Sequence, residues 1–143
     1  MGTADLQEWF PGDHGSVGGG GDITGLSDDA LLWIAEGAEC QRLQVNHRFL
    51  ERLGVKPDYR AALTNESNPK RGIMSFLMSM KHVNRTGPSH LADVSLSARR
   101  RWKTNATEVP EGRAYRPATL EVVSSELETW VDDAEVEIRM AAE

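Results

Sequence analysis

One histidine and a dense run of glycines are the residues of this chain whose types and spacing fit catalytic chemistry. His14 follows the turn residues Pro11 and Gly12 and begins the run. A histidine on a loop after a strand is a common general base, because the imidazole pKa lies near 7. The other interpretation is a solvent-exposed histidine without a chemical role. The candidate loop residues that follow are Gly15, Ser16, Gly18, Gly19 and Gly20.

The glycine run has a functional and a structural interpretation. Clustered glycines allow positive φ angles and a close approach of the backbone to a ligand, and a phosphate cradle is one such use. The run has neither the Gly-Lys-Ser/Thr ending of a P-loop nor the spacing of G-x-G-x-x-G. A flexible loop that binds no ligand remains the alternative.

The remaining histidines and the single cysteine do not form a metal-binding pattern. His47, His82 and His90 lack the spacing of metal ligands. Cys40 is the chain's one cysteine, which excludes an intramolecular disulfide and a cysteine-rich zinc site. We therefore expect no metal and no cofactor.

Charge is distributed in three blocks. Residues 1–54 carry a net charge of −6, residues 55–117 one of +7 and residues 118–143 one of −7. The basic middle either faces an anionic partner, such as a phospholipid head group, or pairs with the acidic ends of the chain. Its densest part, Arg99 to Arg101 beside Trp102, is either a lipid or nucleic-acid contact or a solvated helix face. No nucleic-acid-binding motif accompanies it, so we expect no nucleic-acid partner.

Length and composition limit the class of protein. The 143 residues allow one average domain, and 39% of them are hydrophobic. No apolar run approaches the length of a transmembrane helix, and the first residues lack the pattern of a signal peptide. We expect a cytoplasmic protein.

Helices must position most of these residues. Residues 6–10 predict a short strand that ends at Pro11 and Gly12. Ser27 predicts the N-cap of a helix over residues 28–42, and Gly54 the end of a second helix over 46–53. Residues 73–83 are apolar and predict either a helix or a buried strand. A short helix over 95–102, an irregular segment over 104–117 and an acidic amphipathic helix over 119–141 complete the prediction.

Two segments carry a resemblance to a known family. Residues 9–20 read WFPGDHGSVGGG, and residues 25–36 read GLSDDALLWIAE. Together they resemble the C-terminal part of the α/β-hydrolase family that includes type VI secretion phospholipase effectors. Val94-Ser95, Arg99 and Tyr115-Arg116-Pro117 fit the later part of the family pattern more loosely, so the resemblance covers about residues 6–120.

The resemblance implies a lipid esterase with a Ser-Asp-His triad in that chain order. His14 falls on the family's catalytic histidine, which takes the proton of the serine hydroxyl and returns it to the leaving alcohol. No serine precedes His14, and Ser16 is not preceded by the first glycine of a G-x-S-x-G elbow. We therefore expect the histidine-bearing fragment of a hydrolase, inactive alone, whose nucleophile lies in a half encoded upstream.

The same resemblance sets the expected architecture. The chain is α/β by descent, with residues 1–118 forming the C-terminal part of a hydrolase-like domain and residues 119–143 an acidic helix. As it stands, it is mostly helical, with one or a few short N-terminal strands. Apolar patches are expected on the helix over 28–42, which would otherwise pack on the sheet. The alternative function is a helical interaction module, whose acidic helix binds a partner helix or forms a dimer through Leu120, Val123, Leu127, Trp130 and Ala134.

Overall fold

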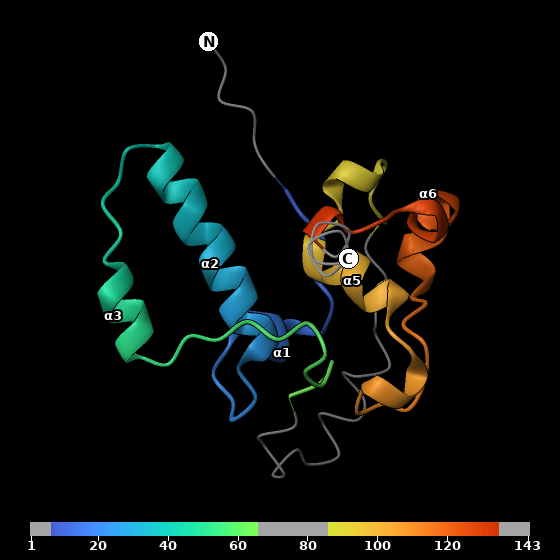
Figure 1. Cartoon of the computed structure of the whole chain (residues 1–143), viewed down its shortest axis with the longest axis horizontal. Coiled ribbons are helices and arrows are strands. Elements are labelled where there is room, and N and C mark those ends of the chain that lie inside the picture. The colour runs from blue at the N-terminus through green and yellow to red at the C-terminus, as the bar shows by residue number, and fades with distance from the viewer. Residues whose placement is uncertain (1–6, 66–85, 135–143) are drawn as a thin grey trace, which may run out of the picture.

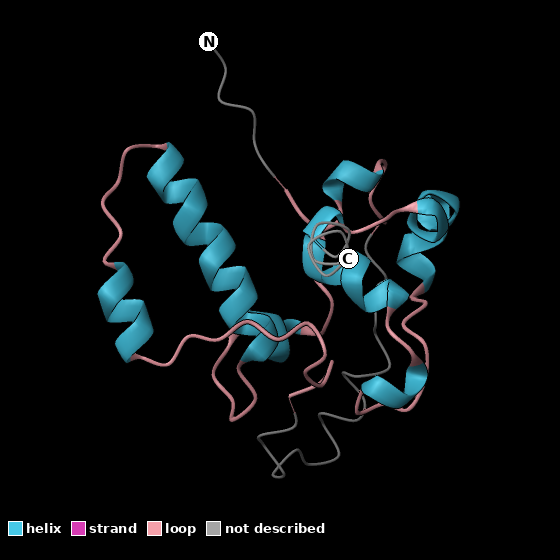
Figure 2. Cartoon of the chain, in the orientation of Figure 1, coloured by secondary structure: helices cyan, strands magenta, loops and turns pink. Residues whose placement is uncertain are grey.

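Helices and loops make up the described part of the chain. The computed structural model describes residues 7–65 and 86–134 (Figure 1). Figure 2 shows no strand among these residues. In Figure 1, α2 and α3 lie on one side and α5 and α6 on the other. The elements are α1 (His14–Gly18), α2 (Gly25–Cys40), α3 (His47–Arg52), η1 (Leu91–Asp93), α5 (Leu96–Lys103), η2 (Ala106–Glu108), η3 (Ala118–Val123) and α6 (Ser124–Thr129).

The strand predicted over residues 6–10 is reduced to one bridge in the residues that the structure describes. Trp9 pairs with Val94 in parallel orientation. The Trp9 N–H donates to the Asp93 carbonyl at 2.8 Å, and the Ser95 N–H donates to the Trp9 carbonyl at 3.1 Å. The pairing does not extend, because η1 ends just before the bridge and α5 begins just after it.

The prediction of a glycine-rich loop over residues 13–22 is wrong for its first half, because residues 14–18 form α1. The Ser16 N–H donates to the Asp13 carboxylate, the Asp13 N–H donates to the Ser16 hydroxyl, and both distances are 2.8 Å. This reciprocal pair is a capping box, which starts α1 and overcomes the low helix propensity of glycine. The helix stops where Gly19 and Gly20 take φ angles of +80° and +95°.

The predicted helix over 28–42 begins three residues earlier than expected, as α2. Its N-cap is Thr24 and not Ser27. The Ser27 hydroxyl instead donates to the Thr24 carbonyl at 2.8 Å, from inside the first turn. Leu26, Ala30 and Ala35 form the buried face of the helix.

Two short helices agree with their sequence signals. In α3, the Asn46 side chain accepts from the Phe49 N–H at 3.1 Å, and Gly54 follows the helix with a φ angle of +76°. In α5, the Ser95 hydroxyl accepts from the Ala98 N–H at 3.2 Å. Both helices form where they were predicted, so both predictions are confirmed, and in each a local cap accepts a hydrogen bond from the first turn. The predicted element over 73–83 lies outside the described residues.

The expectation of one continuous helix over 119–141 is wrong. The segment forms η3 and α6, and α6 ends where Trp130 takes an extended conformation, with ψ of 137°. The Asp132 carboxylate accepts from Arg100 at 2.5 Å and from the Ala134 N–H at 3.2 Å. These hydrogen bonds hold the chain in its non-helical course after α6. Residues 135–141 lie outside the described part.

The main hydrophobic core lies between α5, η3 and α6. Three residues of the predicted amphipathic face, Leu120, Val123 and Leu127, are buried in it. Leu91 and Tyr115 pack against its edge. The face that was a candidate for a partner helix is therefore used within this chain. The buried core residues are Val94, Ala98, Trp102, Leu120, Val123 and Leu127.

Apolar side chains are exposed on α2 and α3, as expected for the first of these helices. On α2, Leu31 is 39% and Ile34 59% exposed, and on α3, Phe49 and Leu53 are also exposed. None of the residues of α3 is buried. The pair of helices therefore presents unburied apolar surface on one side of the molecule (Figure 1).

Candidate functional site

His14 lies at the first position of α1, beside an open cleft. The cleft has a volume of about 910 Å³, and its walls include the aromatic rings of Trp9, Phe10 and Trp33. The Phe10 and Trp33 rings meet edge to face, with their centroids 5.7 Å apart. The His14 side chain is exposed, so its imidazole is open to solvent and to a bound molecule. The further lining residues are Gln7, Glu8, Gly12, Asp13, Val17, Gly18 and Thr86.

Asp13 and Ser16, the polar neighbours of His14, hydrogen bond to the backbone and do not form a triad with it. Ser16 is 1% exposed, and its hydroxyl donates to the Leu63 carbonyl at 2.8 Å. Asp13 holds the capping box of α1. Over residues 7–65 and 86–134, no side chain hydrogen bonds to the imidazole of His14. Within this part of the chain, the histidine therefore has neither a nucleophile to activate nor a carboxylate to orient it.

The glycines predicted to contact a substrate have structural roles in the described residues. Gly15 and Gly18 are part of α1, and Gly19 and Gly20 turn the chain at its end. Beside Gly15, a Cβ atom would meet Asn65 at 3.7 Å, which is ordinary contact. The run therefore ends a helix and leads the chain toward α2.

Both interpretations of the arginine triplet are wrong for Arg101. This side chain is 1% exposed, and it neither faces solvent nor presents a free contact surface. Its guanidinium donates to the Tyr59 carbonyl at 2.6 Å and to the Ala61 carbonyl at 2.5 Å. Arg99 turns back on the segment before α5, donating to the Leu91 and Val94 carbonyls at 2.9 and 2.8 Å.

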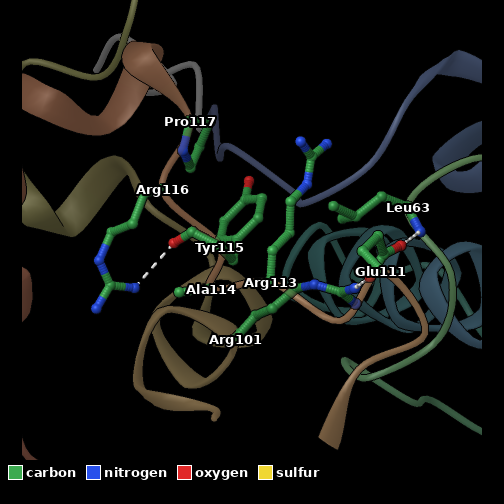
Figure 3. A pocket seen from close by; sticks show the side chains of 8 residues that line it. All are labelled: Leu63, Arg101, Glu111, Arg113, Ala114, Tyr115, Arg116 and Pro117. Atoms are coloured by element: carbon green, nitrogen blue, oxygen red, sulfur yellow. Dashed lines mark hydrogen bonds and ion pairs between the residues drawn. The ribbon is translucent and has the colours of Figure 1, made fainter. Parts of the chain in front are cut away.

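Glu111 links the two halves of the chain, which are residues 7–65 and residues 86–134. Its carboxylate accepts from Arg101 at 2.6 Å and from the Leu63 N–H at 2.7 Å (Figure 3). Burial raises the pKa of Glu111, but the Leu63 hydrogen bond and the Arg101 charge outweigh it, so the pKa lies below its ordinary value. Glu111 is therefore ionised at neutral pH and pairs with Arg101.

A small cavity lies beside this ion pair. It has a volume of about 240 Å³ and is lined by Leu63, Arg101, Glu111, Arg113, Ala114, Tyr115, Arg116 and Pro117 (Figure 3). Burial raises the pKa of Tyr115 to about 12, against the opposing effect of Arg101, so the phenol is protonated at neutral pH. Arg116 points away from the cavity, stacks on Trp102 at 4.0 Å and donates to the Trp102 carbonyl at 2.6 Å.

The described histidines and the cysteine form no metal site. His47 hydrogen bonds to Glu39 at 2.7 Å, on the exposed side of α2 and α3. Cys40 is a free, exposed thiol. In residues 7–65 and 86–134 no group of three potential metal ligands comes together. His82 lies outside these ranges.

Sequence reasoning missed Glu111, because it lies in no motif, and it noted Tyr115 only as part of the resemblance carried by Tyr115-Arg116-Pro117, without a place in a cavity. Glu111 belongs to the segment over 104–117 that was predicted to be irregular, and its partner Leu63 is 48 positions away. No periodicity or spacing marks such a pair. The excess of arginines over residues 99–116 was visible, but it did not show which of them point inward.

Comparisons with known proteins give no assignment. None of the described helices is both long enough and apolar enough to cross a bilayer. No protein-family model matches the chain, and no curated protein or solved structure matches it either.

Proposed function

We propose that this chain is the histidine-bearing C-terminal part of a lipid-ester hydrolase of the Ser-Asp-His type, active only together with a part that carries a G-x-S-x-G nucleophile. The observation that supports this function best is the exposed imidazole of His14 at the edge of an aromatic cleft, without a side-chain partner in residues 7–65 and 86–134. Its role is to take the proton of a serine hydroxyl and return it to the leaving alcohol.

The backbone around His14 is held in a defined conformation, as a general base requires. Pro11 is buried, and Gly12 takes a φ angle of +120°, which residues with a Cβ atom rarely adopt. The capping box of Asp13 and Ser16 then fixes the first turn of α1 on both sides of His14. A mobile loop would not present an imidazole in one position.

The exposed apolar faces of α2 and α3 support the proposal that a second part of the hydrolase packs on this chain. Leu31 and Ile34 of α2 and Phe49 and Leu53 of α3 are the side chains that a further layer of the molecule would cover. Such a layer is also the source of the nucleophile and of the carboxylate that orients His14.

Complementation tests the proposal. The chain is co-expressed with the polypeptide encoded immediately upstream, provided that it carries G-x-S-x-G, and hydrolysis of a phospholipid ester is measured. We expect activity from the mixture, none from either part alone, and a loss of about 10²–10⁴-fold in His14→Ala. His47→Ala, which removes another exposed histidine, is the matched control and should retain activity. An inactive mixture, or activity that His14→Ala leaves unchanged, would count against the proposal.

The second candidate function is a helical interaction module. The same exposed apolar side chains of α2 and α3 favour it, whereas Leu120, Val123 and Leu127 are buried in the chain's own core. Size-exclusion chromatography with light scattering separates the two functions. A stable dimer that melts cooperatively without any partner would favour the module over the hydrolase part.

A further inference from the structure

The cavity beside Arg101 and Glu111 has an excess of positive charge. Its lining contains three arginines and one glutamate, and only one of the arginines, Arg101, is paired with that glutamate. Its volume of about 240 Å³ is small for a drug-sized ligand and suits a single compact group. The chemistry of the walls therefore points to a small anion.

The three arginines differ in what they already bind. Arg101 is occupied by two carbonyls and Glu111, and Arg116 is occupied by Trp102 and by Glu128, at 3.3 Å. Arg113 is exposed, and none of the residues that the structure describes pairs with its guanidinium. Arg113 is thus the cation available to a ligand.

Two further donors belong to the same walls. In Figure 3 the hydroxyl of Tyr115 and the guanidinium of Arg113 point in the same direction. The Nε–H of Arg101 is buried and has no acceptor within the described residues. A donor left without an acceptor in a buried place is costly, and its unbalanced positive charge adds to the field of Arg101.

We propose that this cavity binds a phosphate group, held by the guanidinium of Arg113 and the hydroxyl of Tyr115 in the field of Arg101. A guanidinium presents paired N–H groups that match phosphate oxygens, and Arg113 supplies the positive charge that is left unpaired among the described residues of the lining. The group belongs either to free phosphate or to the head group of a phospholipid. The inference does not depend on the proposed hydrolase function, because Arg113 is not among the residues that line the His14 cleft.

Phosphate titration of the full chain tests the site. Inorganic phosphate is titrated calorimetrically against a chloride control of equal ionic strength. We expect saturable binding that Arg113→Gln weakens by about tenfold or more, the effect of losing one charge-assisted hydrogen bond. Tyr115→Phe, which removes the hydroxyl alone, should weaken it less. Arg52→Gln removes another exposed arginine, on α3, and should leave the affinity within about twofold.

Binding to lipid vesicles distinguishes a phospholipid head group from free phosphate as the source of the phosphate. Sedimentation is measured with phosphatidylcholine vesicles that either contain or lack phosphatidic acid. Binding that requires both phosphatidic acid and Arg113 assigns the site to a lipid head group, whereas binding of inorganic phosphate alone assigns it to a soluble phosphate. The proposal is overturned if neither probe binds saturably, or if Arg52→Gln and Arg113→Gln weaken binding equally. Complementation of esterase activity can succeed or fail independently of these results.

Discussion

Replacing Arg101 by methionine tests whether its guanidinium holds the two halves of the chain together. Arg101 lies on α5, and it donates to Tyr59 and Ala61 of the earlier half at 2.6 and 2.5 Å. It also pairs with Glu111, whose other oxygen accepts from the Leu63 N–H. Methionine retains a long side chain but has no donor, so two carbonyls and one oxygen of the Glu111 carboxylate lose the guanidinium, while the other oxygen keeps the Leu63 N–H.

The expected loss of stability follows from the burial of the pair. Removing one partner of a buried ion pair costs about 3–5 kcal/mol, because the other charge stays behind without compensation. The Arg101 side chain is 0% and the Glu111 side chain 19% exposed, so Glu111 can regain some contact with water. We therefore take the lower end, about 3 kcal/mol. For a domain of this size, that corresponds to a fall in melting temperature of about 10 °C.

Thermal and urea unfolding, followed by circular dichroism, measure this effect. Arg113→Gln removes an exposed arginine from the loop before η3 and should change stability by no more than about 0.5 kcal/mol. Arg101→Met combined with Glu111→Gln should recover part of the loss, because the unpaired carboxylate is gone. A melting temperature of Arg101→Met within about 2 °C of the parent would refute the role given to the buried pair.

Acid should destabilise the fold through Glu111 and Asp132. The pKa of Glu111 lies below its ordinary value of 4.5, and that of Asp132 below 3.8. Each carboxylate therefore stabilises the folded chain fully at pH values above its ordinary pKa. That stabilisation is lost as the pH falls through the lower pKa of the folded state. Melting temperatures from pH 7 to about pH 2 test this, and Glu111→Gln should flatten the acid limb. Gly87→Ala should destabilise by about 1–3 kcal/mol, because a Cβ atom there collides with the Thr119 carbonyl oxygen. Urea unfolding that shows no change in Gly87→Ala would contradict this close packing.

The helices that were predicted correctly have caps that are local in the sequence. Asn46 and Ser95 each accept a hydrogen bond from the backbone three residues later, so the signal and its effect lie within one turn. The start of α1 had the same kind of signal in Asp13 and Ser16, but the glycines around it favoured a loop. The capping box outweighs them in the structure.

The candidate site was only partly predictable for a related reason. The sequence identified His14, and the structure leaves its imidazole exposed beside an aromatic cleft. The sequence did not show that Arg101 points inward, because its carbonyl partners in residues 7–65 are 40 and 42 positions away. Charge density shows that arginines are present, whereas only the folded chain shows which carbonyls they reach.

The sequence by itself determined that α2, α3 and α5 are helical, that the chain contains no internal disulfide and which faces would be apolar. These properties depend on residue type and on spacing over one or two turns. Tertiary structure decided that Leu120, Val123 and Leu127 pack in the chain's own core, that the predicted long helix breaks at Trp130 and that Arg101 is buried. Those outcomes depend on contacts between distant segments, whose energies no local pattern encodes.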